Sequence, residues 1–401
     1  MAREATVVCG SYSVRWDLIC SVAFSVVKRG YLGPFAVARL APGIASAMMI
    51  YQLKMALSEQ TEGWPMLELL RLTRRYMATD PRDKVFALTG IVLDPDSIGL
   101  ELDYRLSTEE VYLSVAIDNL IKLKNMVLLA NGGISSALQN PKLASWVPDW
   151  SHGNDRRIII ASSAQILNFC AAGDSQPAIS ISADKKVLTI RGAIIDSISQ
   201  LNTYTLFTNE DLLDHGTKAG LAKIQLHIKA VDETLRATAE GAYKFPEGQT
   251  REESLWRTLC CDRTTDLSPT RAPAEFVGAY RALRKINEAT GVNGDVDPAV
   301  WTSIDPADLQ HFVAFGNTIT RHCAGRHLCV TSGGYLGHVH DGTLIGDKIC
   351  ILFGSRVPFV LRECEGRFFK LVGECYVHGI MDGEAMKDRD IEPLSRDFEI
   401  I

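Results

Sequence analysis

Three residues near the end of the chain could together carry out acid–base chemistry. His378, Asp382 and Glu384 place an imidazole and two carboxyl groups within seven residues. An imidazole beside a carboxylate can act as a general base, and a second carboxyl group can act as an acid. The same residues are also typical of a turn after a strand, because Asp382 is followed by Gly383. We favour the turn and keep the acid–base site as the alternative.

A second group of candidate residues lies in the segment Asp80–Leu88. Arg82 and Asp83 could line a pocket as an arginine–carboxylate pair. In the structural interpretation, Pro81 ends one element and Arg82 pairs with a carboxylate to fix the next, since charge-assisted hydrogen bonds often hold turns. We favour this interpretation because no nucleophile is close in sequence.

The segment Ser145–Ser151 offers a third candidate, an aromatic-walled site with a carboxylate at its mouth. Its residues would be Trp146, Asp149 and Trp150. Segments of this kind more often bury both indole rings against neighbouring helices. Asp149 would then accept a hydrogen bond in the turn after Pro148, and we favour this structural role.

Histidine and cysteine are concentrated between residues 322 and 350. The residues are His322, Cys323, His327, Cys329, His338, His340 and Cys350. Structural zinc sites use short paired cysteine spacings, which this region lacks. A nucleophilic pair, such as Cys350 or Cys375 with His378, depends on spatial proximity. We predict no metal site and no cofactor.

Composition and charge indicate a globular protein without a nucleic-acid or membrane partner. The chain has 401 residues, of which 46% are hydrophobic and 22% charged, with a net charge of -6. Nucleic-acid surfaces need clustered basic residues, and the chain has no such run. Its first residues lack a signal-peptide core, and its apolar windows are short for a membrane helix. The ten cysteines do not form a secretory framework, so we expect a cytoplasmic protein.

The first part of the chain is expected to be mainly helical. Ala5–Gly10 is typical of a short buried strand that ends in a glycine turn. Asp17 can cap the helix that follows, and a second helix is predicted over Pro65–Met77, with proline at its first position. The capping-box pattern of Ser107–Glu110 predicts a third.

The pattern of apolar residues changes from about Arg157 onward. Strands are predicted at residues 158–160, 178–181 and 187–190, and helices at 221–235, 273–287 and 305–322. Five further short strands, separated by glycine-rich turns, are predicted at 326–331, 346–353, 358–361, 367–372 and 375–377. Their spacing is typical of a small antiparallel barrel or curled sheet.

These elements predict an α+β fold. We expect a helical N-terminal region with a few strands (1–152), a mixed middle region (153–300), and a C-terminal region (301–401) with a helix and a small antiparallel β barrel-like module.

Several motifs, in order along the chain, resemble a family of fungal proteins. The segments Asp80–Leu88, Asp103-Tyr104 and Ser145–Ser151 resemble the pattern that follows the heterokaryon incompatibility (HET) domain. The segments Gly334–Gly337, Gly346-Asp347, Val357–Arg362 and Tyr376–Glu384 resemble the C-terminal module of the same family. The chain is therefore similar to a HET-family protein over most of its length.

The resemblance implies a biological process for the chain, and it also implies that most of a HET domain is missing. In the family, a HET domain related to Toll/interleukin-receptor domains precedes Asp80–Leu88, and some of those domains cleave NAD. The HET domain's tryptophan-rich motifs are absent here, so the resemblance implies the end of a HET domain plus its supporting region, without NAD hydrolase activity. The implied setting is fungal non-self recognition and regulation of cell death through protein contacts.

A mostly missing HET domain would leave the strand of Val7 and Val8 without neighbours. Because uncovered strand edges recruit other chains, we expect a protein partner or self-association at this strand face. The alternative is a truncated family member recruited as an enzyme of secondary-metabolite biosynthesis, with a small-molecule ligand in a pocket between the regions. A flat apolar face beside Val7 favours contacts, whereas a pocket holding His378 or Asp149 favours the enzyme.

Overall fold

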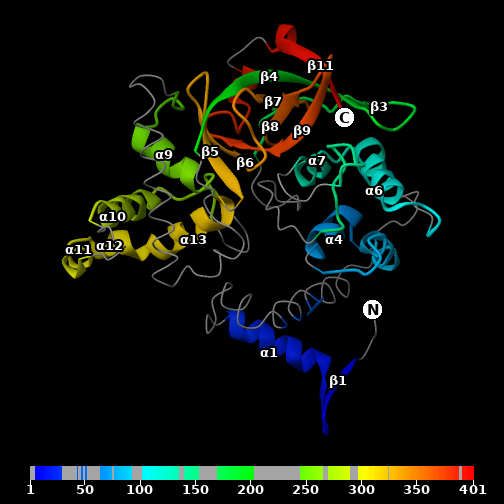
Figure 1. The fold of residues 1–401 in the computed structure, drawn as a ribbon. Helices are drawn as coiled ribbons and strands as arrows, with labels where there is room; N and C mark the ends of the chain where they lie inside the picture. The colour runs from blue at the N-terminus through cyan, green and yellow to red at the C-terminus, as the bar shows by residue number, and fades with distance from the viewer. Residues whose placement is uncertain are drawn as a thin grey trace.

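The computed structural model describes residues 5–28, 43, 47, 50–51, 64–74, 76–92, 102–134, 140–152, 169–202, 244–264, 270–289, 297–323, 325–387 and 391–401. The fold is α+β, which confirms the predicted class. A large sheet lies above two groups of helices, and an N-terminal hairpin with its helix lies farthest from the sheet (Figure 1). The predicted domain boundaries stay a prediction.

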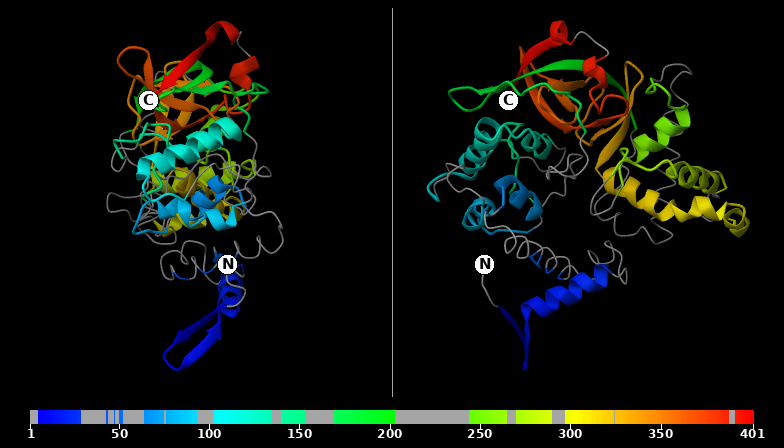
Figure 2. Two further views of the ribbon diagram at one scale, coloured as in Figure 1. Left: turned by 90° about the vertical axis from the view of Figure 1, so that its right-hand side faces the viewer. Right: turned by 180° about the vertical axis from the view of Figure 1, so that it is seen from behind.

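The first elements are the strands β1 (Thr6–Cys9) and β2 (Tyr12–Arg15) and the helix α1 (Trp16–Lys28). β1 and β2 form an antiparallel hairpin, which turns at Gly10 with a φ of +60°. The prediction of a buried strand here is wrong, because β1 pairs with β2 in a two-stranded sheet and three of its four side chains are exposed, with Val7 half-buried. Both views of Figure 2 show the hairpin extending away from the other described elements.

The helix α1 begins earlier than the sequence predicts. Asp17 was expected to cap it, but the structure places Asp17 within its first turn. The reason is that the Trp16 N–H donates to the Ala5 carbonyl at 2.9 Å, which continues the hairpin ladder up to the helix. Asp17 instead accepts a hydrogen bond from Arg15 at 3.4 Å.

One helical group lies between the hairpin and the sheet. It comprises α4 (Met66–Leu72), α5 (Asp83–Phe86), the 3-10 turn η1 (Thr89–Ile91), α6 (Thr108–Ile117), the π-helical turn η3 (Asp118–Lys122) and α7 (Val127–Asn131). The predicted capping box of α6 is confirmed, because the Glu110 N–H donates to Ser107 Oγ at 3.2 Å. The helix predicted over Pro65–Met77 ends at Leu72.

A second helical group lies below the other end of the sheet (Figure 1). It comprises α9 (Arg251–Leu259), α10 (Phe276–Glu288), α11 (Pro298–Thr302), α12 (Pro306–Gln310) and α13 (Phe312–Cys323). Asp305 caps α12 and Pro306 takes its first position, as predicted, but the single helix expected over 305–322 is divided at His311. The strand predicted at 158–160 and the helix predicted at 221–235 lie outside the described residues.

The large sheet contains β3 (Ile179–Ile181), β4 (Leu188–Leu201), β5 (Arg326–Thr331), β6 (Leu336–His340), β7 (Lys348–Leu352), β8 (Phe359–Glu363), β9 (Phe368–Glu374), β10 (Tyr376–Val377) and β11 (Ser395–Ile400). Short helical turns, α14 (Glu384–Lys387) and η5 (Glu392–Leu394), precede β11. The pairings run from β4 through β7, β8, β9 and β11 back to β4, which makes a ring of five strands.

The sheet differs from the expected module in two respects. It is mixed, because β9 and β11 run parallel, whereas the sequence predicted an antiparallel module. It also includes β4, which pairs with β11, β7 and β5 along its length. The strand ranges predicted from the sequence did not include β6 or β11, and the strand predicted at 187–190 covers only the first part of β4.

Gly192 shows how closely the ring strands approach one another. It pairs with Leu352 of β7 and Arg396 of β11. A Cβ atom at this position would lie 2.4 Å from the Ile351 carbonyl oxygen. Glycine is therefore required here by the space between two strands.

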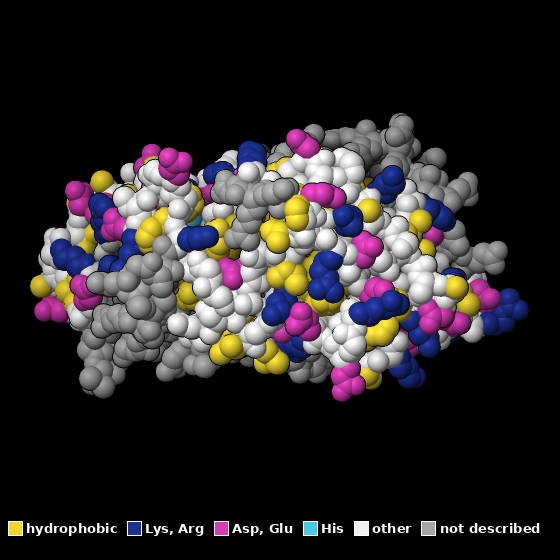
Figure 3. Space-filling model, turned by 90° about the horizontal axis from the view of Figure 1, so that it is seen from above, with side chains coloured by type: hydrophobic (Ala, Val, Ile, Leu, Met, Phe, Trp, Pro, Cys, Tyr) yellow, Lys and Arg dark blue, Asp and Glu magenta, His cyan; other side chains and the backbone are white. Residues whose placement is uncertain are grey.

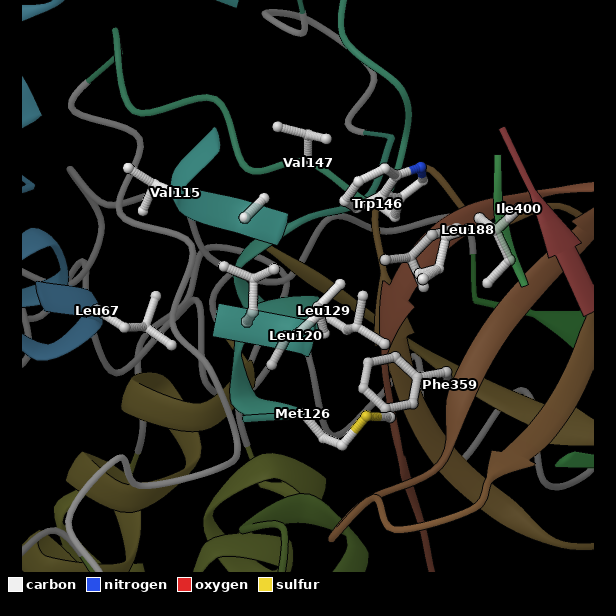
Figure 4. Packing of buried hydrophobic residues seen from close by; sticks show 14 of the residues in the cluster. Leu67, Val115, Leu120, Met126, Leu129, Trp146, Val147, Leu188, Phe359 and Ile400 are labelled. Carbon is white, nitrogen blue, oxygen red and sulfur yellow. The ribbon is translucent and has the colours of Figure 1, made fainter. Parts of the chain in front are cut away.

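Hydrophobic clusters cover both sides of the ring. One cluster joins the ring to α4, α6 and α7; in Figure 4, Trp146 lies beside Leu188 and Ile400, and Leu129 lies beside Phe359. The other cluster is built mainly from smaller aliphatic side chains of the alternate strand positions, among them Ala193, Ile195, Ile349, Ile351, Val360 and Val372. This alternation follows the two-residue period of a strand. None of the described helices has the length and apolar character needed to cross a membrane.

Candidate functional site

His378 follows β10 and is held between two side chains. Its Nδ1 lies 2.8 Å from the Tyr376 hydroxyl, and its Nε2 lies 2.6 Å from Gln249 Oε1. Because an amide oxygen only accepts, Nε2 carries the ring proton and Tyr376 donates to Nδ1. Both ring nitrogens are therefore engaged within the protein.

The surroundings of His378 keep its imidazole neutral. The side chain is 6% exposed. Burial, reinforced by the positive charges of Arg257 and Arg271, lowers the pKa of His378 to about 4. A general base works best with a pKa near the working pH. The arrangement suits a structural hydrogen bond better than proton transfer near neutral pH.

Asp382 and Glu384, the two predicted partners of His378, are bound elsewhere. The Asp382 carboxylate pairs with Arg271. The Glu384 carboxylate accepts a hydrogen bond from the Asp382 N–H at 2.7 Å. The three candidate residues lie in or next to the turn after β10, and each of them binds a different partner.

Arg271 belongs to a charged chain that connects this turn to α9. It donates to Asp262 Oδ2 at 3.0 Å, and Asp262 Oδ1 accepts from Arg257 at 2.6 Å. Arg257 also pairs with Glu253 at 2.8 Å. Burial raises the pKa of Asp262, although both guanidinium groups oppose this. The chain of pairs fixes the second helical group against the sheet.

The candidate pair Arg82 and Asp83 joins three segments of the first helical group. Arg82 binds Asp80 with two hydrogen bonds, of 2.9 and 2.6 Å, and also donates to the Leu106 carbonyl at 2.8 Å. Asp83 accepts a hydrogen bond from the Tyr104 hydroxyl at 2.6 Å. These contacts support the structural interpretation of the motif.

The next residue in this motif, Lys84, was not singled out in the sequence. Its ammonium group is buried and donates to the carbonyls of Thr73 at 3.2 Å and Arg74 at 2.9 Å, just after α4. A cation at this position also complements the negative end of the helix dipole. Lys84 therefore binds the carbonyls of the residues that directly follow the end of α4 at Leu72.

The rings of the third candidate are buried and do not line an open site. Trp146 and Trp150 belong to the hydrophobic core, and the Trp150 ring meets Tyr112 edge-on at 5.1 Å. Asp149 Oδ1 accepts a hydrogen bond from the Ser151 N–H at 2.9 Å, as expected for a turn residue.

Asp149, Ser151 and His152 have the residue types of a hydrolase triad. Ser151 Oγ lies 2.9 Å from His152 Nδ1, and Asp149 Oδ2 lies 3.4 Å from the same nitrogen. In a working triad, the histidine uses one nitrogen for the nucleophile and the other for the carboxylate. The geometry is therefore that of a hydrogen-bonded turn.

Ser145, at the start of this segment, is a contact point that sequence reasoning missed. Its N–H donates to the Ile401 carbonyl at 3.1 Å, and its Oγ donates to the same carbonyl. Ser145 Oγ also accepts from the Leu371 N–H at 2.9 Å. A small polar residue directly before a buried tryptophan was the available signal. Ser145 fastens the first helical group to β9 and β11.

The cysteine and histidine region brings together Cys323 and His338, a pair that differs from those considered in the sequence. Cys323 Sγ lies 3.5 Å from His338 Nε2 and donates to the Leu259 carbonyl at 3.0 Å. Burial raises the pKa of the Cys323 thiol and lowers the pKa of His338 to about 3. Both groups are neutral and fully buried, which is unsuitable for a nucleophilic pair. Across the described ranges, no group of three or more potential ligands could hold a metal ion.

A buried ion pair connects β5 to β9. Arg326 Nη2 lies 2.7 Å from Glu374 Oε1, and both side chains are fully buried. Arg326 Nη1 also donates to the Glu374 carbonyl at 3.2 Å. Nothing in the local sequence indicates that these two residues, far apart in the chain, would meet.

The surface seen from above the sheet is mixed in character. In Figure 3, basic and acidic side chains alternate with scattered hydrophobic ones over the described part of this face. Four large apolar side chains are exposed on the hairpin and α1: Val8 is 70% exposed, Tyr12 81%, Leu18 57% and Val22 56%. We call these four residues the hairpin surface.

Comparison with known proteins gives two matches. A sequence model described as the Het-6 beta-barrel domain matches residues 185–398, which is more than half of the chain and covers the ring of strands except the end of β11. The chain is also 24% identical over 350 residues to heterokaryon incompatibility protein 6, OR allele, of Neurospora crassa. That match covers 76% of this chain and 49% of the relative, so the chain spans about half the length of its curated relative. No solved structure matches the chain.

Proposed function

The chain belongs to the heterokaryon incompatibility (HET) family, and from this premise we propose that it acts in fungal non-self recognition through protein contacts, without catalysis. The observation that carries the proposal is the binding of each acid–base candidate within the fold. His378 is neutral between Tyr376 and Gln249, and Asp382 is paired with Arg271. These side chains hold the turn after β10 in place.

The hairpin surface supports the second part of the proposal, that the protein works by contact. Leu18 and Val22 are four residues apart, so they lie next to each other along one side of α1. Val8 and Tyr12 add exposed apolar area on the two opposite faces of the hairpin. Apolar side chains gathered on a surface often mark a site of protein association. We assign the partner contact to this surface, in the cytoplasm, with regulation of the cell-death response as its outcome.

A growth assay in a fungal strain that expresses the chain tests this proposal. The double variant V8K Y12S places a charge and a small polar side chain on the hairpin surface, and we expect loss of the incompatibility response. Leu394 is also exposed but lies in η5, far from the hairpin in sequence, so L394K is the matched control and should leave the response intact. An unchanged response in V8K Y12S, at wild-type abundance, would refute the assignment of the contact.

A further inference from the structure

We infer that the hairpin surface associates with a second copy of this chain, by pairing of the two β1 strands across a two-fold axis. The inference rests on the proposed contact function and names the partner. It is carried by the direction of the backbone hydrogen-bonding groups of β1 and by the absence of charge along this strand.

The register of the hairpin shows which backbone groups are free. Cys9 and Tyr12 close the two-residue turn, and the Trp16 N–H donates to the Ala5 carbonyl at the other end. Hydrogen-bonded and non-hydrogen-bonded pairs alternate in an antiparallel ladder. The pair Val8–Ser13 is therefore a non-hydrogen-bonded pair, so the N–H and C=O of Val8 point away from β2. Among the described strands, β1 pairs with β2 alone.

The outward backbone N–H and C=O groups of such an edge can pair with a second extended strand. Proteins usually protect exposed edges with charges, prolines or bulges. The β1 sequence Thr6–Cys9 has none of these and pairs with β2 in continuous register. Threonine and valine also favour strands. A hairpin alone is marginally stable, whereas a four-stranded sheet made from two hairpins is more stable.

The second copy fits this edge because β1 carries no charge that would repel its own copy. The outer edge of β2 is less suitable, since it carries the exposed Arg15. The other edge strands of the described fold offer fewer backbone groups for pairing, because β3 has three residues and β10 has two. Self-association through one patch is also the simplest closed symmetry for two copies.

The proposed pairing has a defined register. With the axis at Val8, the Val8 N–H of each copy donates to the Val8 carbonyl of the other. The flanking position then brings Val7 opposite Cys9 of the second copy, as a non-hydrogen-bonded pair. The Cα atoms of such a pair lie about 4.5 Å apart, a distance that a disulfide can span.

Sedimentation of the full chain at increasing concentration tests the edge. Val8→Pro removes the N–H that points away from β2. The hydrogen bonds between β1 and β2 are retained, because Val8 makes none of them. Ser13→Pro makes the same change on the opposite edge and is the matched control. We expect a concentration-dependent dimer for the wild type and for S13P, and its loss in V8P. A wild-type chain that stays monomeric, or a V8P dimer equal to the wild type, overturns the inference.

Crosslinking tests the register without depending on the proline variants. In V7C, the introduced thiol should form a disulfide with Cys9 of the second copy after mild oxidation with diamide, and mass spectrometry should find the linked peptide. The wild type and S13C should not form it. A V7C chain that fails to crosslink refutes the two-fold pairing. If V8K Y12S still abolishes the incompatibility response in that case, the contact function stands and the partner is a different protein.

Discussion

The neutral state of His378 has a measurable consequence for stability at low pH. The perturbation is a decrease of pH from 7 to 5, compared between the wild type and H378Q, which cannot titrate at this position. In the unfolded chain the histidine has its usual pKa of 6.5, whereas in the folded protein it titrates at about 4. Below pH 6.5 the unfolded chain therefore binds a proton that the folded protein does not bind.

The sign and size of the effect follow from these two pKa values. Because the unfolded state binds more protons between pH 6.5 and 4, the free energy of unfolding falls as the pH decreases through this window. Each pKa unit corresponds to about 1.4 kcal/mol, so the full effect is about 3 kcal/mol. At pH 5 about 2 kcal/mol of this should be reached. Above pH 6.5 the contribution is constant.

Urea unfolding at a series of pH values measures this difference directly. The free energy of unfolding of the wild type minus that of H378Q should decrease by about 2 kcal/mol from pH 7 to pH 5. The buried His338 titrates in both proteins, so its contribution cancels. H152Q makes the same type of substitution at a half-exposed histidine and serves as the control for the substitution itself. A difference for H378Q that does not change with pH would show that His378 is solvated and would refute the reasoning.

Three further substitutions test the contacts that hold the fold, each by urea unfolding. E374Q leaves Arg326 as a buried charge without its carboxylate and should cost about 3–5 kcal/mol, whereas E363Q, at an exposed pair, should cost below about 1 kcal/mol. G192A should cost about 1–3 kcal/mol, because its Cβ would meet the Ile351 carbonyl. S145A leaves the buried Leu371 N–H without its acceptor and should cost about 1–3 kcal/mol. Effects near zero would contradict each assignment.

Local signals in the sequence were sufficient for several elements. Ser107 and Glu110 are three residues apart, so the capping box that starts α6 is fully contained in one short segment. Asp305 and Pro306 mark the start of α12 in the same way. The α+β class follows from the alternation of such segments, because the period of the apolar residues differs between helices and strands.

Contacts between distant residues could not be predicted in this way. The ring of strands depends on β4 pairing with β7 and β11, which lie more than a hundred residues later in the chain. Ser145 with Ile401 and Arg326 with Glu374 are likewise brought together only by the fold. The exposure of β1 was misjudged because an apolar strand sequence does not reveal whether a second layer covers it.

For the candidate site, the sequence supplied the residues but not their partners. Asp382 was considered as an acid–base group, and its pairing with Arg271 depends on the position of the segment that precedes α10. His378 was considered with the carboxylates of its own segment, whereas its hydrogen bond goes to Gln249. A histidine and two carboxylates near one another in sequence therefore did not establish a catalytic arrangement.

The central claim is that the chain acts by contact and needs no acid–base chemistry. The most direct measurement is the incompatibility response of a fungal strain that expresses the double variant D382N E384Q, which removes both carboxylates of the turn after β10. Our account predicts a response equal to that of the wild type at equal abundance, with only a small decrease in melting temperature, because the lost Asp382–Arg271 pair is partly exposed. Loss of the response in a variant that is folded and equally abundant would contradict it.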